Sequence, residues 1–153
     1  MCLILLVNQF SILYSMRAYF IFSFVLLSST LLAQQPDDII GLWLVEDKDA
    51  YIRIYEENNK YFGKVTWIEE PYDEDGNPQT DPNGEPVLEM EIMKNFEFED
   101  GEWVDGTMYD AQEGKTYYGS IEMEDKDTLE LRGSVDSFGI LGRTETWTRI
   151  KEK

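Results

Sequence analysis

EWVDGTMYD (residues 102–110), AQEG (111–114) and KTYYGSIEM (115–123) follow one another in this chain and indicate its type of structure most clearly. The two outer segments are rich in aromatic and β-branched residues, and the segment between them is polar and ends in glycine. Two strand-like runs separated by a few turn residues are typical of an antiparallel hairpin. Neither run repeats its apolar residues at the spacing that indicates a helix. The stretch therefore predicts two neighbouring β-strands.

The same pattern recurs from residue 39 to the end of the chain. We expect strands over residues 39–46, 51–57, 61–68, 95–99, 102–110, 115–123, 128–134 and 142–151. Asn58-Asn59 and Asp100-Gly101 suit tight hairpin turns with positive φ. About eight strands in an open sheet would expose two edges, and closing the sheet removes them. The sequence predicts an all-β fold, an antiparallel up-and-down β-barrel, with a β-sandwich as the alternative.

Residues 69–86 interrupt this rhythm, because they hold four prolines and no run of strand-forming residues. Proline lacks the backbone donor that a β-ladder needs, so we expect a long loop at a rim or over an opening. The following residues, 87–94, suit a short helix or an irregular strand. Asp73, Asp75, Asn77 and Asp81 place oxygen ligands close together, which gives a weak calcium-site hypothesis, although the spacing does not match an EF-hand. A solvated acidic loop is the alternative.

The beginning of the chain has the pattern of a secretory signal. Arg17 precedes an apolar block, and a tail of small residues ends at Ala33. We expect Met16 to be the true start, residues 1–33 to be removed, and residues 34–153 to form one domain without cysteine. An uncleaved membrane anchor is the alternative. The expected location is periplasmic or secreted, with no lipid anchor and no membrane insertion after cleavage.

Charge and composition exclude several classes of function. The formal net charge is −18, so we expect no nucleic-acid partner, whereas a basic protein partner remains open. The chain contains no histidine, which excludes Ser-His-Asp catalysis and imidazole-ligated zinc. We therefore expect a protein that is not an enzyme and has no cofactor. A pair of carboxylates acting on glycans is the catalytic alternative.

Arginine and aromatic residues within the expected strands define a candidate ligand site. The residues proposed to clamp an anionic or amphipathic molecule inside the barrel are Arg53, Arg132, Arg143, Tyr117 and Trp147. In the alternative, Arg53 and Arg132 face outward and a C-terminal arginine stacks on a core tryptophan. The aromatics expected in the core are Trp43, Trp67, Trp103, Trp147, Phe62, Phe96 and Phe98. Glycines within strands, such as Gly106 and Gly119, are expected to mark bends.

Six ordered pieces carry a family resemblance: GLW (41–43), YFGKV (61–65), WVDGTMYD (103–110), GKTY (114–117), LELRG (129–133) and GRTETWTR (142–149). Together they resemble domain of unknown function 2147, a bacterial family that looks like exported lipocalin-type barrels. The chain departs from that pattern in a shorter segment at 81–84 and in Ala111, where proline is common. Gly-x-Trp with a late arginine is also similar to the lipocalin pattern, in which the tryptophan packs at the barrel floor under that arginine. The resemblance implies this role for Trp43 with Arg143 or Arg149.

The function expected from these observations is small-molecule binding in a lipocalin-like barrel, without catalysis. The alternative is an envelope interaction protein that meets a basic partner through its acidic loop, residues 69–85, and its acidic surface.

Overall fold

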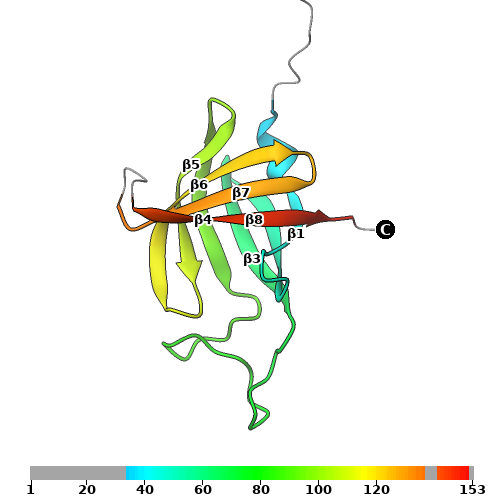
Figure 1. The fold of residues 1–153 in the computed structure, drawn as a ribbon, viewed down its shortest axis with the longest axis vertical. Helices are drawn as coiled ribbons and strands as arrows, with labels where there is room; N and C mark the ends of the chain where they lie inside the picture. The colour runs from blue at the N-terminus through cyan, green and yellow to red at the C-terminus, as the bar shows by residue number, and fades with distance from the viewer. Residues whose placement is uncertain (1–33, 137–140, 152–153) are drawn as a thin grey trace, which may run out of the picture. The chain divides into compact units, whose positions relative to one another are not determined.

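The computed structural model describes residues 34–136 and 141–151, and over these residues the chain forms a closed antiparallel barrel (Figure 1). The strands are β1 (Gly41–Leu44), β2 (Ala50–Glu57), β3 (Lys60–Ile68), β4 (Glu91–Glu99), β5 (Glu102–Asp110), β6 (Lys115–Asp125), β7 (Thr128–Ser134) and β8 (Gly142–Ile150). Each strand pairs with the next one in sequence, and β8 pairs with β1 through Trp43 opposite Arg149. The predicted up-and-down barrel is confirmed, and the β-sandwich alternative is excluded.

The expected tight turns are also present. Asn58 and Asn59 have φ of 56° and 62°, and Asp100 and Gly101 have φ of 51° and 98°. Asparagine, aspartate and glycine tolerate this left-handed conformation better than other residues. These turns therefore fix the register of the β2–β3 and β4–β5 hairpins.

Several strand boundaries differ from the prediction by one to four residues, and two of these differences have a structural cause. Residues 36–39, which overlap the expected first strand, form the short 3₁₀ helix η1 (Pro36–Ile39), because Pro36 sets its first turn and Asp38 accepts a hydrogen bond from the Gln35 backbone N–H. Strand β4 begins at Glu91, within residues 87–94, for which the sequence suited either a short helix or an irregular strand; the irregular strand is the correct alternative from Glu91 onward. Its pairing with β3 is irregular around Gly63 and Met93, which obscures the alternation in the sequence.

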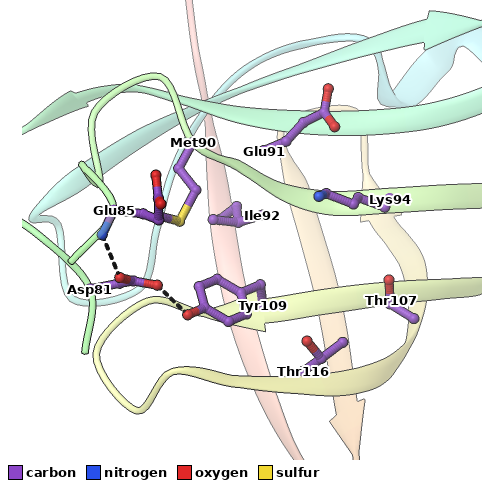
Figure 2. Close-up of a pocket in the computed structure, with 9 residues that line it drawn as sticks. All are labelled: Asp81, Glu85, Met90, Glu91, Ile92, Lys94, Thr107, Tyr109 and Thr116. Carbon is purple, nitrogen blue, oxygen red and sulfur yellow. Dashed lines mark hydrogen bonds between the residues drawn. The ribbon is translucent and has the colours of Figure 1, made fainter. Parts of the chain in front are cut away.

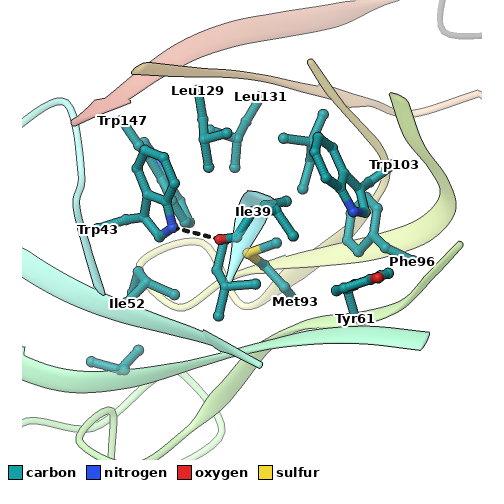
Figure 3. Close-up of a cluster of buried hydrophobic side chains, with 13 residues drawn as sticks. Ile39, Trp43, Ile52, Tyr61, Met93, Phe96, Trp103, Leu129, Leu131 and Trp147 are labelled. Atoms are coloured by element: carbon teal, nitrogen blue, oxygen red, sulfur yellow. Dashed lines mark hydrogen bonds between the residues drawn. The ribbon is translucent and has the colours of Figure 1, made fainter. Parts of the chain in front are cut away.

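Helix η1 closes one end of the barrel. Ile39 is fully buried among Trp43, Trp103 and Met93, as Figure 3 shows. The Trp43 indole N–H donates to the Ile39 carbonyl at 2.9 Å, and the Trp103 indole N–H donates to the Pro36 carbonyl at 3.1 Å. The two indole groups thus bury large apolar surfaces and also donate hydrogen bonds to two backbone carbonyl groups of η1.

Arg149 covers this closed end. Its guanidinium carbon lies 4.1 Å from the Trp43 ring centroid, and its nitrogens donate to the carbonyls of Asp38, Ile40 and Lys126 at 2.5, 2.9 and 2.7 Å. Partial burial lowers the pKa of Arg149 from its usual value, although arginine stays charged in proteins. One cation therefore joins η1, the start of β1 and the β6–β7 turn.

Glycines in β5 and β6 make room for an aromatic ring of the core. A Cβ atom at Gly106 or Gly119 would overlap the fully buried Phe96 ring. These glycines are thus needed for space, and the β5–β6 register also shifts between Trp103 and Gly106, where a bend was expected.

The prediction was wrong for two of the expected core aromatics. Trp67 is 39% exposed and packs against Tyr51 with ring centroids 4.5 Å apart, while Phe62 stacks on Tyr55 at 5.8 Å. All four rings lie on the outer face of the β2–β3 hairpin, because the inward positions are taken by residues such as Ile52, Ile54 and Val65.

The compact unit formed by the barrel spans Gln34–Lys153. The predicted signal peptide, residues 1–33, and the proposed start at Met16 lie outside the described residues. In the described part of the chain, no helix has the length and apolar character needed to cross a membrane.

Candidate functional site

A large cavity opens at the end of the barrel opposite η1. Its volume is about 1190 Å³, and its inner wall consists of the inward-facing side chains Ile52, Val65, Met108, Leu131 and Trp147. The segments at its rim are the β1–β2 turn, the β3–β4 loop, the β5–β6 turn and the described part of the β7–β8 loop. We call this opening the mouth. Its volume is slightly above the range of about 300–1,000 Å³ that is typical of small-molecule sites, so it has room for a small molecule.

The β3–β4 loop, residues 69–90, forms a strap along the mouth and is the longest loop in Figure 1, drawn in green. It consists of two small turns, held by bridges between Tyr72 and Pro78 and between Thr80 and Pro86. The strap lies close to the β5–β6 turn: a Cβ atom built at Gly114 would lie only 3.2 Å from the Pro82 side chain. The expected position of this loop at a rim is therefore correct.

Asp81 ties the strap to the barrel wall. Its carboxylate accepts hydrogen bonds from the Tyr109 hydroxyl and from the backbone N–H of Glu85 at 2.9 Å, as Figure 2 shows. Asn83 donates through its backbone at 2.9 Å and its side chain at 3.1 Å. The Tyr109 hydrogen bond and these further donors lower the pKa of Asp81 to about 2. We call the Asp81–Tyr109 contact the latch.

A smaller pocket of about 240 Å³ lies beside the latch (Figure 2). It shares Asp81, Ile92 and Tyr109 with the large cavity. Pairing between β4 and β5 reaches Met93 opposite Met108 and does not continue toward the mouth. The pocket thus lies where these two strands separate, and Asp81 and Glu85 of the strap form part of its lining. Tyr109 was not among the predicted site residues, although the turn residues around Asp81 gave a local signal for an ordered loop.

The predicted ligand residues divide between the two faces of the barrel. Arg143, Tyr117 and Trp147 line the cavity. Arg53 lies between the buried residues Ile52 and Ile54, so it faces outward, and Arg132 follows the buried Leu131 in the same way. The structure therefore does not bring two arginines together in the barrel. The alternation of side chains along each strand decides this placement.

Among the described residues that line the cavity, Arg143 is the one arginine, and it pairs with a neighbouring acid. An Arg143 Nη nitrogen lies 2.6 Å from the Glu145 carboxylate, and this pairing raises the pKa of Arg143. Tyr117 donates its hydroxyl to Glu113 at 2.8 Å, and this bond, with Lys115, lowers the pKa of Glu113. Both contacts are solvent-exposed, so each contributes little to stability.

Trp147 has an unsatisfied polar atom. The side chain is 2% exposed, and its indole nitrogen, which is fully buried, finds no hydrogen-bond partner among the described residues. Leaving a buried donor unpaired costs about 1–3 kcal/mol. By contrast, the indoles of Trp43 and Trp103 both donate to backbone carbonyls. Trp147 therefore presents an unused donor in a residue that lines the cavity.

The calcium-site hypothesis receives no support from the strap. Asp73 accepts hydrogen bonds from the backbone of Asp75 at 3.0 Å and of Asn77 at 2.8 Å, and Asp81 is occupied by the latch. Within residues 34–136 and 141–151, no group of three or more acidic, cysteine or histidine side chains is arranged to hold a metal ion. The acidic residues of the strap instead shape its two turns.

We expect the latch to make a pH-dependent contribution to stability. The pKa of Asp81 is about 2 in the folded protein, below that of an unfolded aspartate, so its stabilisation is complete above about pH 4 and lost as the pH falls toward 2. Asp81→Asn should lower the free energy of unfolding at pH 7. At pH 2.5 the free energies of unfolding of the variant and the parent protein should differ less than at pH 7. Urea unfolding at both pH values tests this. Glu74→Gln, in the same loop, is the control, and an equal effect of both variants at each pH would contradict the expectation.

Comparisons with known proteins agree with this architecture. A comparison with curated proteins finds no match to the chain. A solved structure described as "Protein HP1028 from the human pathogen Helicobacter pylori belongs to the lipocalin family" has a TM-score of 0.59 and 21% sequence identity, covering 74% of this chain and 84% of that one. At this identity the likeness concerns the fold, which is that of a lipocalin-like barrel. Residues 41–149 match the model of the family described as "Uncharacterized protein conserved in bacteria (DUF2147)", and the chain therefore belongs to that family.

Proposed function

We propose that this protein binds a small molecule in the mouth of its barrel and does not act as an enzyme. The cavity of about 1190 Å³ carries this proposal. Eight-stranded barrels can be filled completely by their own side chains, and then hold no ligand. Here Ile39, Trp43 and Trp103 pack at the closed end, and the cavity opens at the opposite end.

The lining suits an amphipathic ligand. Apolar side chains such as Ile52, Val65 and Leu131 form the inner wall, while the rim consists of polar and charged residues. An apolar part of a ligand would therefore lie against the inner wall, with its polar part toward solvent. The buried Trp147 N–H offers a position where a ligand oxygen could accept a hydrogen bond. A lipocalin-like fold supports this use only by analogy.

We propose that binding takes place outside the cytoplasm, in the periplasm or after secretion. The support is the sequence of residues 16–33, with its single arginine, apolar block and small-residue end. N-terminal sequencing of protein recovered from the envelope fraction tests this, with a mature start at Gln34 as the expected result. Recovery only from the cytoplasm with an intact N-terminus would contradict it.

Binding is tested with a neutral fluorescent probe, N-phenyl-1-naphthylamine. Gly133 lines the cavity, and a Cβ atom there would make only an ordinary contact of 3.6 Å with Tyr117. Gly133→Phe should therefore fold while its ring occupies the cavity. We expect saturable binding of one probe per protein, weakened about tenfold or more by Gly133→Phe, since the variant removes the space for the probe.

Glu130→Phe is the matched control, because Glu130 lies between the buried Leu129 and Leu131 and faces outward. It adds the same ring to the outer face of the same strand, β7. In nitrogen-resolved NMR spectra, the probe should shift the Trp147 indole signal more than the Trp43 signal. Equal affinity in the two phenylalanine variants, or no binding by the parent protein, would reject the proposed function.

A further inference from the structure

The charge around the mouth has one predominant sign. Arg143 is the one cationic side chain among the described residues that line the cavity, and it is already paired with Glu145. Carboxylates come from the β1–β2 turn, the first residues of the strap and the β5–β6 segment, and we consider the four from the first two of these segments. The members that we call the mouth acids are Asp47, Asp49, Glu69 and Glu70.

The mouth acids lie together and lack basic partners. The Glu69 backbone N–H donates to the Asp49 carbonyl at 2.7 Å, which joins the two segments that carry them. None of the ion pairs in the described part of the chain involves these four residues. Lys48 lies between Asp47 and Asp49 in sequence but does not line the cavity. Their negative charge is therefore not neutralised by a neighbouring side chain of the lining.

A second observation independently points to an occupant. Trp147 lines the inner part of the cavity, and its buried indole N–H has no acceptor within the described residues. Nearly all buried donors in folded proteins are paired, so the expected acceptor for this indole N–H is a group from outside the chain, either a water molecule or a ligand. The cavity thus combines an apolar wall, an unused donor near that wall and an acidic rim.

We propose that the ligand is an amphipathic cation, with an apolar body that carries a hydrogen-bond acceptor and an ammonium or similar group that faces the mouth acids. This inference rests on the proposed function and specifies its ligand class. An anionic ligand would instead meet unpaired carboxylates of the same sign, which disfavours its binding. The arginine clamp that would have favoured an anion is absent, because Arg53 and Arg132 face outward.

The test compares three probes that share one apolar chain: octylammonium, octanol and octanoate. Each displaces N-phenyl-1-naphthylamine from the full mature protein at low ionic strength. We expect octylammonium to bind about tenfold more tightly than octanol and octanoate to bind most weakly. The preference for the cation should decrease as sodium chloride is added, because the mouth acids are largely exposed to solvent.

A matched pair of double variants separates the mouth from the overall charge. Asp49→Asn with Glu69→Gln removes two carboxylates from the mouth, and Glu99→Gln with Glu102→Gln removes two from the β4–β5 hairpin at the closed end. Only the first pair should abolish the cation preference while leaving octanol affinity unchanged. If both double variants lost the preference for octylammonium to the same extent, the net charge alone would attract the cation and the inference would be overturned.

The remaining outcomes distinguish the two proposals. If the neutral fluorescent probe and octanol bind but octylammonium has no advantage, the ligand-class inference fails and the proposed function stands. If no probe binds, or if Gly133→Phe leaves all affinities unchanged, the proposed function fails as well.

Discussion

Arg149→Ala is expected to lower the free energy of unfolding by about 2–4 kcal/mol. The variant removes three hydrogen bonds from a charged donor to backbone carbonyls, and it removes the cation over the Trp43 ring. The partial exposure of Arg149 keeps the loss below the sum of its separate contacts.

Urea unfolding followed by tryptophan fluorescence measures this effect. Arg149→Lys keeps the charge but not the planar fork, and is expected to recover less than half of the loss. Arg143→Ala is the control in the same strand, because its exposed pair with Glu145 is expected to contribute about 0.5 kcal/mol or less. A loss for Arg149→Ala no larger than that of the control would contradict its role at the closed end.

Gly106→Ala is expected to destabilise the barrel by about 1–3 kcal/mol, or more if the strand cannot shift. The added methyl group would occupy space held by the Phe96 ring, which is fully buried and contacts both Gly106 and Gly119 positions. Close packing leaves the ring no vacant volume into which it can move. The same measurement of unfolding in urea reports the change.

A double-mutant cycle identifies the cause. Phe96→Leu alone should destabilise through lost packing, but Gly106→Ala should cost much less in that background, since the smaller side chain leaves room for the methyl group. Gly101→Ala provides the contrast, because no atom lies within 4 Å of a Cβ atom there and its cost arises from its φ of 98°. Additive effects of Gly106→Ala and Phe96→Leu would reject the packing explanation.

Local patterns were sufficient for much of the fold. Short aromatic and β-branched runs predicted the strands, and Asn58-Asn59 and Asp100-Gly101 predicted turns that have the expected positive φ. These features depend on residues that are close in sequence, so they can be identified without knowing the tertiary structure. The start of β4 was less certain because its pairing with Gly63 and Lys64 is irregular, and a bulge breaks the alternation of period two.

The candidate site was only partly predictable. Tyr117, Trp147 and Arg143 do line the cavity, but they occur together with Tyr109 and Asp81, whose hydrogen bond joins residues 28 positions apart in the chain. Arg53 and Arg132 have the right chemical type for a ligand clamp. Successive side chains of a strand lie on opposite faces, however, and these two arginines are on the outer face, one residue away from inward positions. The calcium hypothesis failed to gain support because the strap uses its own backbone donors to occupy Asp73.

The strand-rich character of this protein, its hairpin order, its acidic charge and the exclusion of histidine chemistry could all be predicted from the sequence. All of these follow from composition or from neighbouring residues. Three further features could be seen only in the folded protein: β1 pairs with β8, η1 packs into one end of the barrel, and a cavity opens at the other end. The reason is physical: barrel closure, burial and cavity volume arise from contacts between residues far apart in the chain, and local pattern carries no information about the space between them.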